Sequence, residues 1–298
     1  MHNVSKGDNV VVSILEHHSN FVPWQQLCKA KGAELRVIGM NSTGGLNYNE
    51  AEKLINEKTQ LVAVTHISNA IGSIVDIKKI IKIAKKHSSL VLIDASQSVP
   101  HMQVNFKELN ADFMVFSGHK MLGPTGIGVL AGKKHLLESM NPFIFGGGMI
   151  GEVSITNTSW QESPYKFEAG TPNIAGAAGL SAAVDYINKI GIKNIEARDK
   201  KLTQYALVKL SSIKNVEIIG KPQAGIISFN VKNMHAHDIS SLLDRKNICI
   251  RAGHHCCQPL MKSLGITSTC RISFHIYNSE KDIDLLCSSL VHASKVLS

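Results

Sequence analysis

The sequence predicts an α/β protein with a mostly parallel central sheet flanked by helices and a smaller C-terminal α+β unit. Short apolar runs that do not alternate with polar residues recur through the first half of the chain, and helix-like stretches separate several of them. Such runs are typical of strands covered on both faces. After Thr171-Pro172-Asn173 the pattern changes to two long helical stretches followed by mixed strands and helices. The chain has 298 residues, 44% of them hydrophobic, which is enough for a substantial core.

The first unit contains six β-prone apolar runs that we predict to form the sheet. They lie at residues 10–15, 35–38, 61–65, 90–93, 113–116 and 128–131. Between the third and the fourth, residues 77–86 have lysines on one helical face and isoleucines on the other, which indicates a surface helix. Ligands of such sheets bind at the carboxyl ends of the strands, so polar residues at these ends are the candidates for a site.

The second unit begins after two helical stretches, at residues 176–190 and from there to about 213, which Gly191 separates. Beyond them we expect strands at residues 225–231, 248–251 and 270–275, and helices at residues 237–244, 259–264 and 280–296. We therefore divide the chain into a large α/β domain, residues 1–190, and a small α+β domain, residues 191–298.

Charge and composition exclude several classes of function. The 32 Lys and Arg exceed the 23 Asp and Glu and give a net charge of +9, but many of the lysines lie on a solvated helix face without interleaved aromatic residues, so we expect no nucleic-acid partner. No apolar stretch approaches ~18 residues and no export signal is visible, which predicts a cytoplasmic protein without a membrane span. The six cysteines lack Cys-x-x-Cys spacing, so we expect free thiols and no metal.

An acid and a lysine follow two neighbouring strands of the predicted sheet. Asp94 ends the run at residues 90–93, and Lys120 lies in Ser117-Gly118-His119-Lys120, directly after residues 113–116. A lysine can form a Schiff base with the aldehyde of pyridoxal 5'-phosphate, and a carboxylate can keep the pyridine nitrogen protonated so that the ring withdraws electrons. The pair therefore indicates an enzyme with this cofactor.

Other polar residues lie at the same strand ends. Gln97 could reach the phenolic oxygen of the pyridoxal ring, and Ser117 and His119 could donate to its phosphate. Either imidazole of His17-His18 could stack on the ring, and Asn69 could bind the cofactor or a substrate carboxylate. Taken singly, such residues more often cap helices or form turns. Their occurrence in chain order at successive strand ends favours the site.

The second unit contributes a thiol and cations. In Arg251-Ala252-Gly253-His254-His255-Cys256, a glycine-containing loop brings a cysteine close to an arginine and two histidines, and nearby cations favour the reactive thiolate. Arg271 opens a later predicted strand and could hold a carboxylate through two parallel hydrogen bonds.

Seven segments together resemble the Suf-type cysteine desulfurases of the class V aminotransferase family, which are enzymes dependent on pyridoxal phosphate. The resemblance extends over essentially the whole chain and keeps the order and approximate spacing of the motifs. It implies the transferase fold that aspartate aminotransferase shares, known as fold type I. The segments are Glu16-His17-His18, Ser68-Asn69, Asp94-Ala95-Ser96-Gln97, Ser117-Gly118-His119-Lys120, Gly123-Pro124-Thr125-Gly126, Phe167-Glu168-Ala169-Gly170-Thr171-Pro172 and Arg251-Ala252-Gly253-His254-His255-Cys256.

The resemblance implies that Lys120 holds the cofactor, that Asp94 pairs with its pyridine nitrogen and that His17 stacks on its ring. It also implies a homodimer, because the phosphate site includes a threonine from the neighbouring subunit. The remaining residues implied to bind the cofactor are Gln97, Asn69, Ser117, His119 and that neighbouring Thr171.

For the substrate, the resemblance implies that Asn69 and Arg271 hold the carboxylate of L-cysteine and that Cys256 accepts its sulfur. Lys120, Cys256 and His17 are then the catalytic residues. The products are L-alanine and a Cys256 persulfide, which passes to a sulfur-acceptor protein of the Suf system for iron–sulfur cluster assembly.

Two departures from the family pattern keep alternatives open. The family's opening segment is missing, and with it a helix N-terminus that helps to bind phosphate, so we expect weaker cofactor binding. Cys257 stands where we expect a non-thiol residue, and it either forms a competing persulfide or does nothing. The alternatives are a selenocysteine lyase, with L-selenocysteine as substrate, and a catalytically silent dimerisation or acceptor-binding module.

Overall fold

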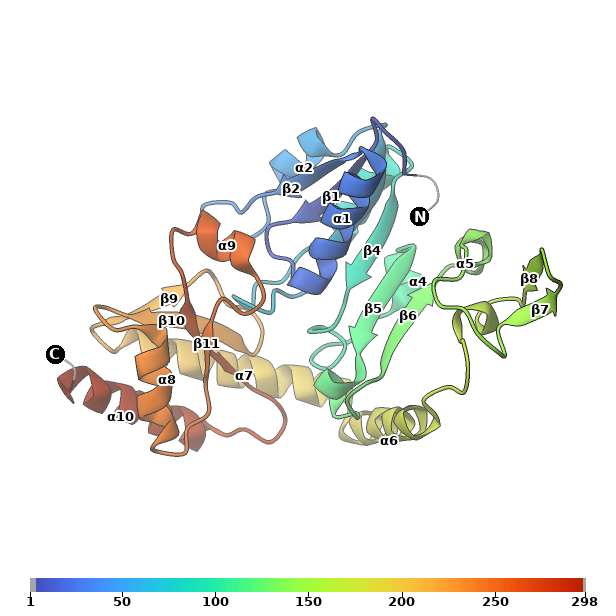
Figure 1. Cartoon of the computed structure of the whole chain (residues 1–298). Coiled ribbons are helices and arrows are strands. Elements are labelled where there is room, and N and C mark those ends of the chain that lie inside the picture. Colours follow the sequence, from blue (N-terminus) through green and yellow to red (C-terminus); the bar gives the residue numbers. More distant parts are fainter. Residues whose placement is uncertain (1–3, 297–298) are drawn as a thin grey trace.

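The computed structural model describes residues 4–296, and its centre is a six-stranded sheet (Figure 1). The strand order is β2-β1-β3-β4-β5-β6, and all neighbouring pairs are parallel except β5 and β6. All six predicted runs are strands of this sheet, so the predicted α/β class is confirmed. The strands are β1 (Asn9–Ser13), β2 (Glu34–Ile38), β3 (Thr59–Thr65), β4 (Leu90–Asp94), β5 (Phe113–Ser117) and β6 (Gly128–Gly132).

Both faces of the sheet are buried at its central strands β1, β3 and β4, which explains why these strands do not alternate polar and apolar residues. Val11 and Val62 lie in one hydrophobic cluster, while Val10 and Leu61 lie in another on the opposite face. Successive side chains of a strand point to opposite faces, so most positions of a central strand are apolar.

Helices cover each face. On one side, α1 (Val22–Lys31) contributes Trp24 and Cys28 to the core. On the other, α2 (Tyr48–Leu54) and α3 (Ile77–Lys85) pack on the sheet. The predicted amphipathic helix is α3, with its isoleucines buried. Two short helices, α4 (Phe106–Leu109) and α5 (Lys134–Ser139), lie near β5 and β6.

An arm projects from the large unit beyond α5. It contains the hairpin of β7 (Ile150–Val153) and β8 (Thr158–Trp160), and the chain returns to the body through α6 (Ile174–Ile190), as Figure 1 shows at the right. Several large apolar side chains of this segment are exposed: Phe143, Ile144, Phe145, Val153, Ile155, Tyr165 and Ile174.

The C-terminal unit is a four-stranded antiparallel sheet with helices. The sheet order is β11-β12-β10-β9. Its strands are β9 (Val216–Ile219), β10 (Ile226–Val231), β11 (Arg251–Gly253) and β12 (Thr269–Ser273), and the helices are α7 (Ile192–Ser211), α8 (Ala236–Asp244), α9 (Gln258–Ser263) and α10 (Glu280–Val296). The predicted strand at residues 248–251 was misplaced, because only Arg251 and the two residues after it pair with β12.

One helix ties the two units together. Leu260 and Met261 of α9 are buried in the same hydrophobic cluster as the residues of β1, β3 and β4. The division at residue 190 stays a prediction; the chain there turns through Gly191, whose φ is +88°. Within residues 4–296, no helix is both long and apolar enough to cross a membrane.

Candidate active site

The carboxyl ends of β1, β3, β4 and β5 lie along one edge of the sheet, as their parallel pairing requires. The segment after β1 carries His17 and the short 3₁₀ helix η1 (His18–Asn20), and the segment after β3 carries Asn69. Asp94 is the last residue of β4, and Lys120 lies in the 3₁₀ helix η2 (Gly118–Met121) that follows β5.

The turn that presents Lys120 depends on two glycines. A Cβ atom at Gly118 would lie 2.9 Å from Ile127 Cγ2, and one at Gly123 would lie 2.9 Å from the carbonyl oxygen of Gly118. Since a side chain at either position would collide with its surroundings, Gly118 and Gly123 specify the backbone on the two sides of the lysine.

Lys120 and Asp94 face a common space. Burial lowers the pKa of Lys120, and the negative charge of Asp94 opposes this effect. Asp94 is 7% exposed, and one of its oxygens, Oδ1, accepts a hydrogen bond from the Ser96 amide at 2.9 Å. Among the described residues, the Lys120 amine has no hydrogen-bond partner and the second Asp94 oxygen has none either.

His17 belongs to the same group. Its Nδ1 accepts a hydrogen bond from the Ser19 amide at 3.1 Å and lies 2.8 Å from Ser19 Oγ, which fixes the ring. Burial lowers the pKa of His17, the charge of Lys120 lowers it further and that of Asp94 raises it. The imidazole of His17 is therefore close enough to Lys120 and Asp94 for their charges to affect its pKa.

These residues fit pyridoxal phosphate. A buried carboxylate with one free oxygen suits a protonated pyridine nitrogen, and a half-buried amine of lowered pKa suits an aldehyde. Gln97 is half-buried in the turn after β4. Ser117 makes no side-chain capping bond and His119 is exposed, so both are free to donate to an anion.

Arg271 and Asn69 form a second group beside Lys120. Arg271 Nη1 donates to the Asn69 carbonyl oxygen at 2.8 Å, while its buried Nε has no partner among the described residues. Burial lowers the pKa of Arg271, and together with the charge of the neighbouring Arg251, its partner across β11 and β12, it brings the pKa to about 10. A buried cation with an unsatisfied donor is suited to a carboxylate. The Asn69 side chain has a further role, since Nδ2 donates to the carbonyl oxygen of His255 at 2.6 Å.

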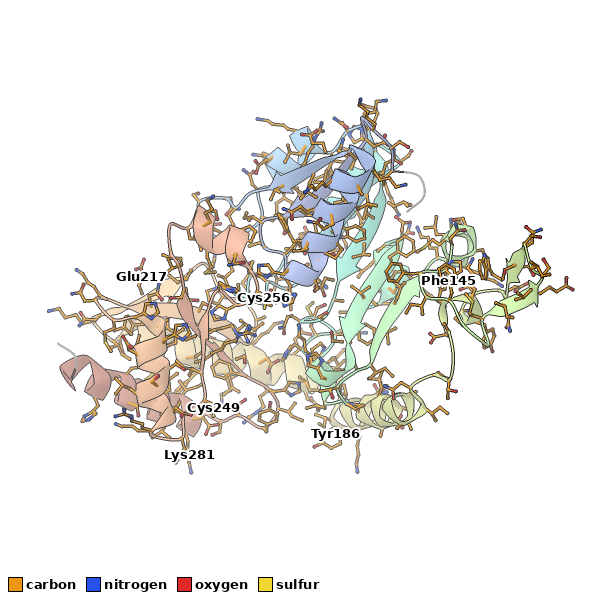
Figure 2. All side chains as sticks on the ribbon, in the orientation of Figure 1. Phe145, Tyr186, Glu217, Cys249, Cys256 and Lys281 are labelled. Atoms are coloured by element: carbon orange, nitrogen blue, oxygen red, sulfur yellow. The ribbon has the colours of Figure 1, made fainter. Side chains whose placement is uncertain are left out.

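Cys256 lies in a strained loop at the junction of the two units (Figure 2). Both His255 and Cys256 have φ near +54°, which is the left-handed region that ordinary side chains disfavour. Arg251 Nη2 lies 3.5 Å from Cys256 Sγ, and the charge of Cys256 acts on Lys120. The structure thus brings the thiol, the lysine and the two arginines of the prediction into one site.

Cys257 differs from its neighbour. It is fully buried, and its Sγ lies 3.6 Å from the carbonyl oxygen of Ile14. Burial raises the pKa of the Cys257 thiol to about 12. Of the two possibilities left by the sequence, this environment favours an inert residue.

Thr171 is predicted to act in the site of a neighbouring subunit. It is exposed in the connection between η3 (Tyr165–Phe167) and α6. Its predicted role depends on a neighbouring subunit and stays a prediction.

The sequence analysis missed Glu16. This fully buried carboxyl accepts hydrogen bonds from Ser13 Oγ at 2.5 Å, from the Thr65 amide at 2.9 Å and from Asn20 Nδ2 at 2.6 Å. Burial raises the pKa of Glu16 to about 8. The signal was present in Glu16-His17-His18, because a carboxyl directly after a buried strand needs a structural reason.

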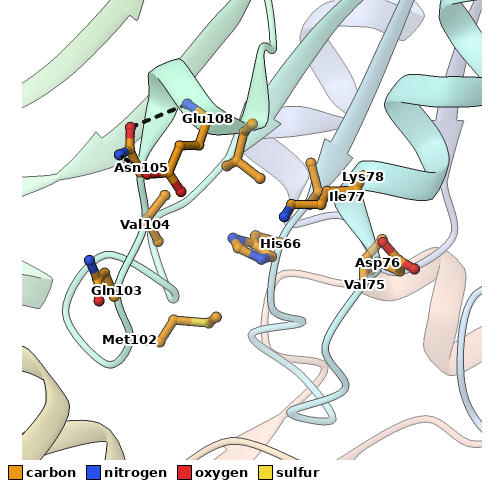
Figure 3. A pocket seen from close by; sticks show the side chains of 11 residues that line it. His66, Val75, Asp76, Ile77, Lys78, Met102, Gln103, Val104, Asn105 and Glu108 are labelled. Atoms are coloured by element: carbon orange, nitrogen blue, oxygen red, sulfur yellow. Dashed lines mark hydrogen bonds between the residues drawn. The ribbon is translucent and has the colours of Figure 1, made fainter.

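A cavity of about 420 Å³ lies away from this group (Figure 3). Its walls come from the segment after β3, the start of α3 and the segment around α4, and its lining includes His66, Val75, Met102, Val104 and Leu109. His66 is 7% exposed, its Nδ1 has no partner among the described residues, and burial lowers its pKa to about 4. Within residues 4–296, no group of three or more His, Cys, Asp or Glu is arranged to hold a metal ion.

A family match and the similar proteins found by comparison point to the same family. Residues 1–286 match the family described as aminotransferase class-V. A probable cysteine desulfurase of Halalkalibacterium halodurans is 48% identical over 289 residues, which are 97% of this chain and 71% of that protein.

Solved structures agree with this family assignment. The structure of the cysteine desulfurase CsdA (S-sulfonic acid) from Escherichia coli has a TM-score of 0.97 at 35% identity and covers 100% of this chain and 74% of that one. An apo cysteine desulfurase from Thermococcus onnurineus NA1 has a TM-score of 0.95 at 42% identity and covers 99% and 75%.

Proposed function

The chain belongs to the aminotransferase class-V family, and from this premise we propose that it is a pyridoxal-phosphate-dependent cysteine desulfurase. It converts L-cysteine to L-alanine and retains the sulfur as a persulfide on Cys256. One observation carries the proposal: Asp94 and Lys120 follow the neighbouring parallel strands β4 and β5, Arg271 donates to the Asn69 carbonyl oxygen beyond β3, and Arg251, which pairs with Arg271, lies 3.5 Å from Cys256 Sγ.

Pyridoxal phosphate, when bound, supplies an electron sink that makes the Cα proton of an amino acid acidic. We assign Lys120 to its aldehyde, Asp94 to its pyridine nitrogen and His17 to the face of its ring. The other residues assigned to the cofactor are Gln97, Asn69, Ser117, His119 and Thr171 of the neighbouring subunit.

Arg271 orients the substrate. Its guanidinium, with an unpaired buried Nε, binds the carboxylate of L-cysteine, and the carbonyl of Asn69 keeps Nη1 in place. Because burial lowers the pKa of Lys120, more of its amine is neutral near pH 7 than for an exposed lysine, and a neutral amine can take the Cα proton.

Cys256 then receives the sulfur. Its thiolate attacks the sulfur of the substrate, a sulfur–sulfur bond forms and the carbon–sulfur bond breaks, with the electron pair leaving on the carbon fragment. That fragment takes up protons and leaves as L-alanine. Arg251, whose Nη2 lies 3.5 Å from Cys256 Sγ, holds the thiolate in the site.

The sulfur passes to an acceptor protein, for which the partial exposure of Cys256 leaves access. We propose a Suf-type acceptor and iron–sulfur cluster assembly as the destination.

The exposed apolar side chains of the arm, among them Phe143 and Ile155, support a homodimer, because apolar patches of this kind mark interfaces. Six free cysteines suit the reducing cytoplasm, where we place the reaction.

The function is tested by purifying the chain with added pyridoxal phosphate. The wild type should have a visible absorbance band that Lys120→Ala lacks, and it should release alanine from L-cysteine. Cys256→Ala should keep the band and lose alanine formation, whereas Cys249→Ser, which alters an exposed cysteine elsewhere in the C-terminal unit, should keep both. A wild-type chain without the band, or Cys256→Ala with unchanged turnover, would refute the proposal.

A further inference from the structure

The loop that carries Cys256 is held from the other unit by two hydrogen bonds of one residue. The His18 amide donates to the Cys256 carbonyl oxygen at 2.7 Å. The His18 ring accepts at Nε2 from the Gln258 amide at 3.1 Å. The ring also lies 5.6 Å from that of His254, which itself accepts from the Cys256 amide through Nδ1. The side chain of His18 thus contacts the loop on both sides of the thiol.

The loop needs such anchors because its backbone is strained. Two consecutive residues, His255 and Cys256, have positive φ, and conformations of this kind persist only where the surroundings impose them. Within the loop, the His254 carbonyl oxygen accepts from the Cys257 amide. From the large unit, Asn69 and His18 bond to the backbone of this loop, and the Ile14 carbonyl oxygen accepts from Cys257 Sγ at 3.6 Å.

We propose that His18 is the positioning residue of the nucleophile loop, and that its neutral ring, by accepting from the Gln258 amide, holds Cys256 in place for attack on the substrate's sulfur. This assignment rests on the proposed desulfurase function. His17 and His18 are adjacent in the sequence but serve different parts of the site, since His17 faces Lys120 and Asp94 while His18 faces the loop.

The contact depends on the protonation of His18. A protonated ring has no lone pair at Nε2, so the bond from Gln258 is lost when His18 takes up a proton. Burial and the charge of His254 lower the pKa of His18 below its usual range, so the contact is present at neutral pH and is lost as pH falls through that lowered value. The groups that face His18 are His17 on its own segment, and His254, Cys256 and Gln258 on the opposite one.

The test compares His18→Leu, which removes the acceptor, with His18→Gln, which keeps an uncharged acceptor at a similar reach. The readout is the rate of amide hydrogen exchange in the peptide that spans residues 256–264. It is measured on the full chain, purified with pyridoxal phosphate. Loss of one neutral hydrogen bond predicts about 2- to 10-fold faster exchange in His18→Leu at pH 8, with partial or full restoration in His18→Gln. His292→Leu, which changes an exposed histidine of α10, is the matched control and should exchange like the wild type.

The pH response separates positioning from a general loss of stability. As the pH falls from 8 through the lowered pKa of His18, after correction for the intrinsic rate, the wild-type peptide should lose protection and His18→Gln should not. In turnover, His18→Leu should lower kcat by a similar factor and leave the visible absorbance and the KM for L-cysteine unchanged.

Equal pH responses of wild type and His18→Gln would overturn the proposal, and this comparison stands even if His18→Leu does not fold. Absence of alanine formation in the wild type would refute the desulfurase function instead, while the exchange data would still decide whether His18 holds the loop.

Discussion

The adjacent thiols Cys256 and Cys257 are expected to react at very different rates, and the expected ratio follows from their environments. Burial raises the pKa of Cys257 to about 12, so at pH 8 only about one thiol in 10⁴ is ionised, against roughly 10–25% for an ordinary cysteine. A thiolate of higher pKa is the stronger nucleophile, and this raises the reaction rate of the Cys257 thiolate by about 30-fold. Ionisation alone therefore slows Cys257 by about 30- to 100-fold, and its complete burial slows it further.

The assay is alkylation by iodoacetamide at pH 8 in a Cys249→Ser background, which removes an exposed thiol outside the site. Peptide mass spectrometry gives the rates of both positions in one sample, and Cys256 should be modified at least about 30-fold faster. Cys257→Ala should keep alanine formation from L-cysteine. It should also lower the free energy of unfolding by about 1 to 1.5 kcal/mol, because it removes one buried heavy atom and leaves a small cavity.

Comparable labelling of the two cysteines would refute this reasoning, as would loss of turnover in Cys257→Ala with an intact fold and cofactor band. Either result would mean that Cys257 reaches the site and that the buried position seen here is not the one that operates.

Two further predictions address substrate binding and pH. Arg271→Ala should raise the KM for L-cysteine about 10- to 100-fold, with a smaller effect on kcat, since it removes a charge-assisted contact; steady-state kinetics with an unchanged KM would contradict the assignment. Glu16 has an ordinary pKa of 4.5 that burial raises to about 8, so the folded chain holds a proton that the unfolded chain releases, and stability falls as pH rises between these values. We expect urea unfolding to show that the free energy of unfolding of Glu16→Gln rises relative to that of the wild type by up to about 1.4 kcal/mol per pH unit between pH 5 and pH 8. A difference between the two proteins that stays constant over this range would mean that Glu16 does not titrate there.

The centre of the sheet was predictable because its middle strands are buried on both faces, and a run such as residues 90–93 admits few other structures. The short helix α1 was not predicted, since Cys28 is its one buried residue and its apolar pattern is correspondingly weak. β9 was missed for a similar reason, because its burial is only partial. The strand expected at residues 248–251 was displaced, because pairing with β12 starts at Arg251 and a β-prone sequence without a partner strand stays irregular.

In the site, the strand-end rule predicts that Asp94 and Lys120 lie at one edge of the sheet, and the parallel pairing of β4 and β5 puts both residues there, while their roles stay a prediction. Contacts between distant segments were beyond that rule. The bond from Asn69 to the His255 carbonyl joins residues 186 positions apart, and the bond from His18 to residue 258 spans 240. No local pattern encodes which histidine of an adjacent pair meets the cofactor site and which meets the loop.

The position of Cys256 is set more by the large unit than by its own. Two residues in the left-handed region cost on the order of 1 to 3 kcal/mol each. Directly after them, Cys257, Leu260 and Met261 are buried in the core of the large unit, and each of the two larger side chains contributes about 1.5 to 3 kcal/mol. The stabilisation from burying these residues is large enough to offset the conformational cost of the two positive-φ residues. The loop is therefore fixed at both ends, by β11 on one side and by α9 on the other. The remaining freedom of the Cys256 sulfur atom is limited by the hydrogen bonds of His18 and Asn69 to the loop. For this reason, the loss of one acceptor atom on His18 can shift the position of the nucleophile.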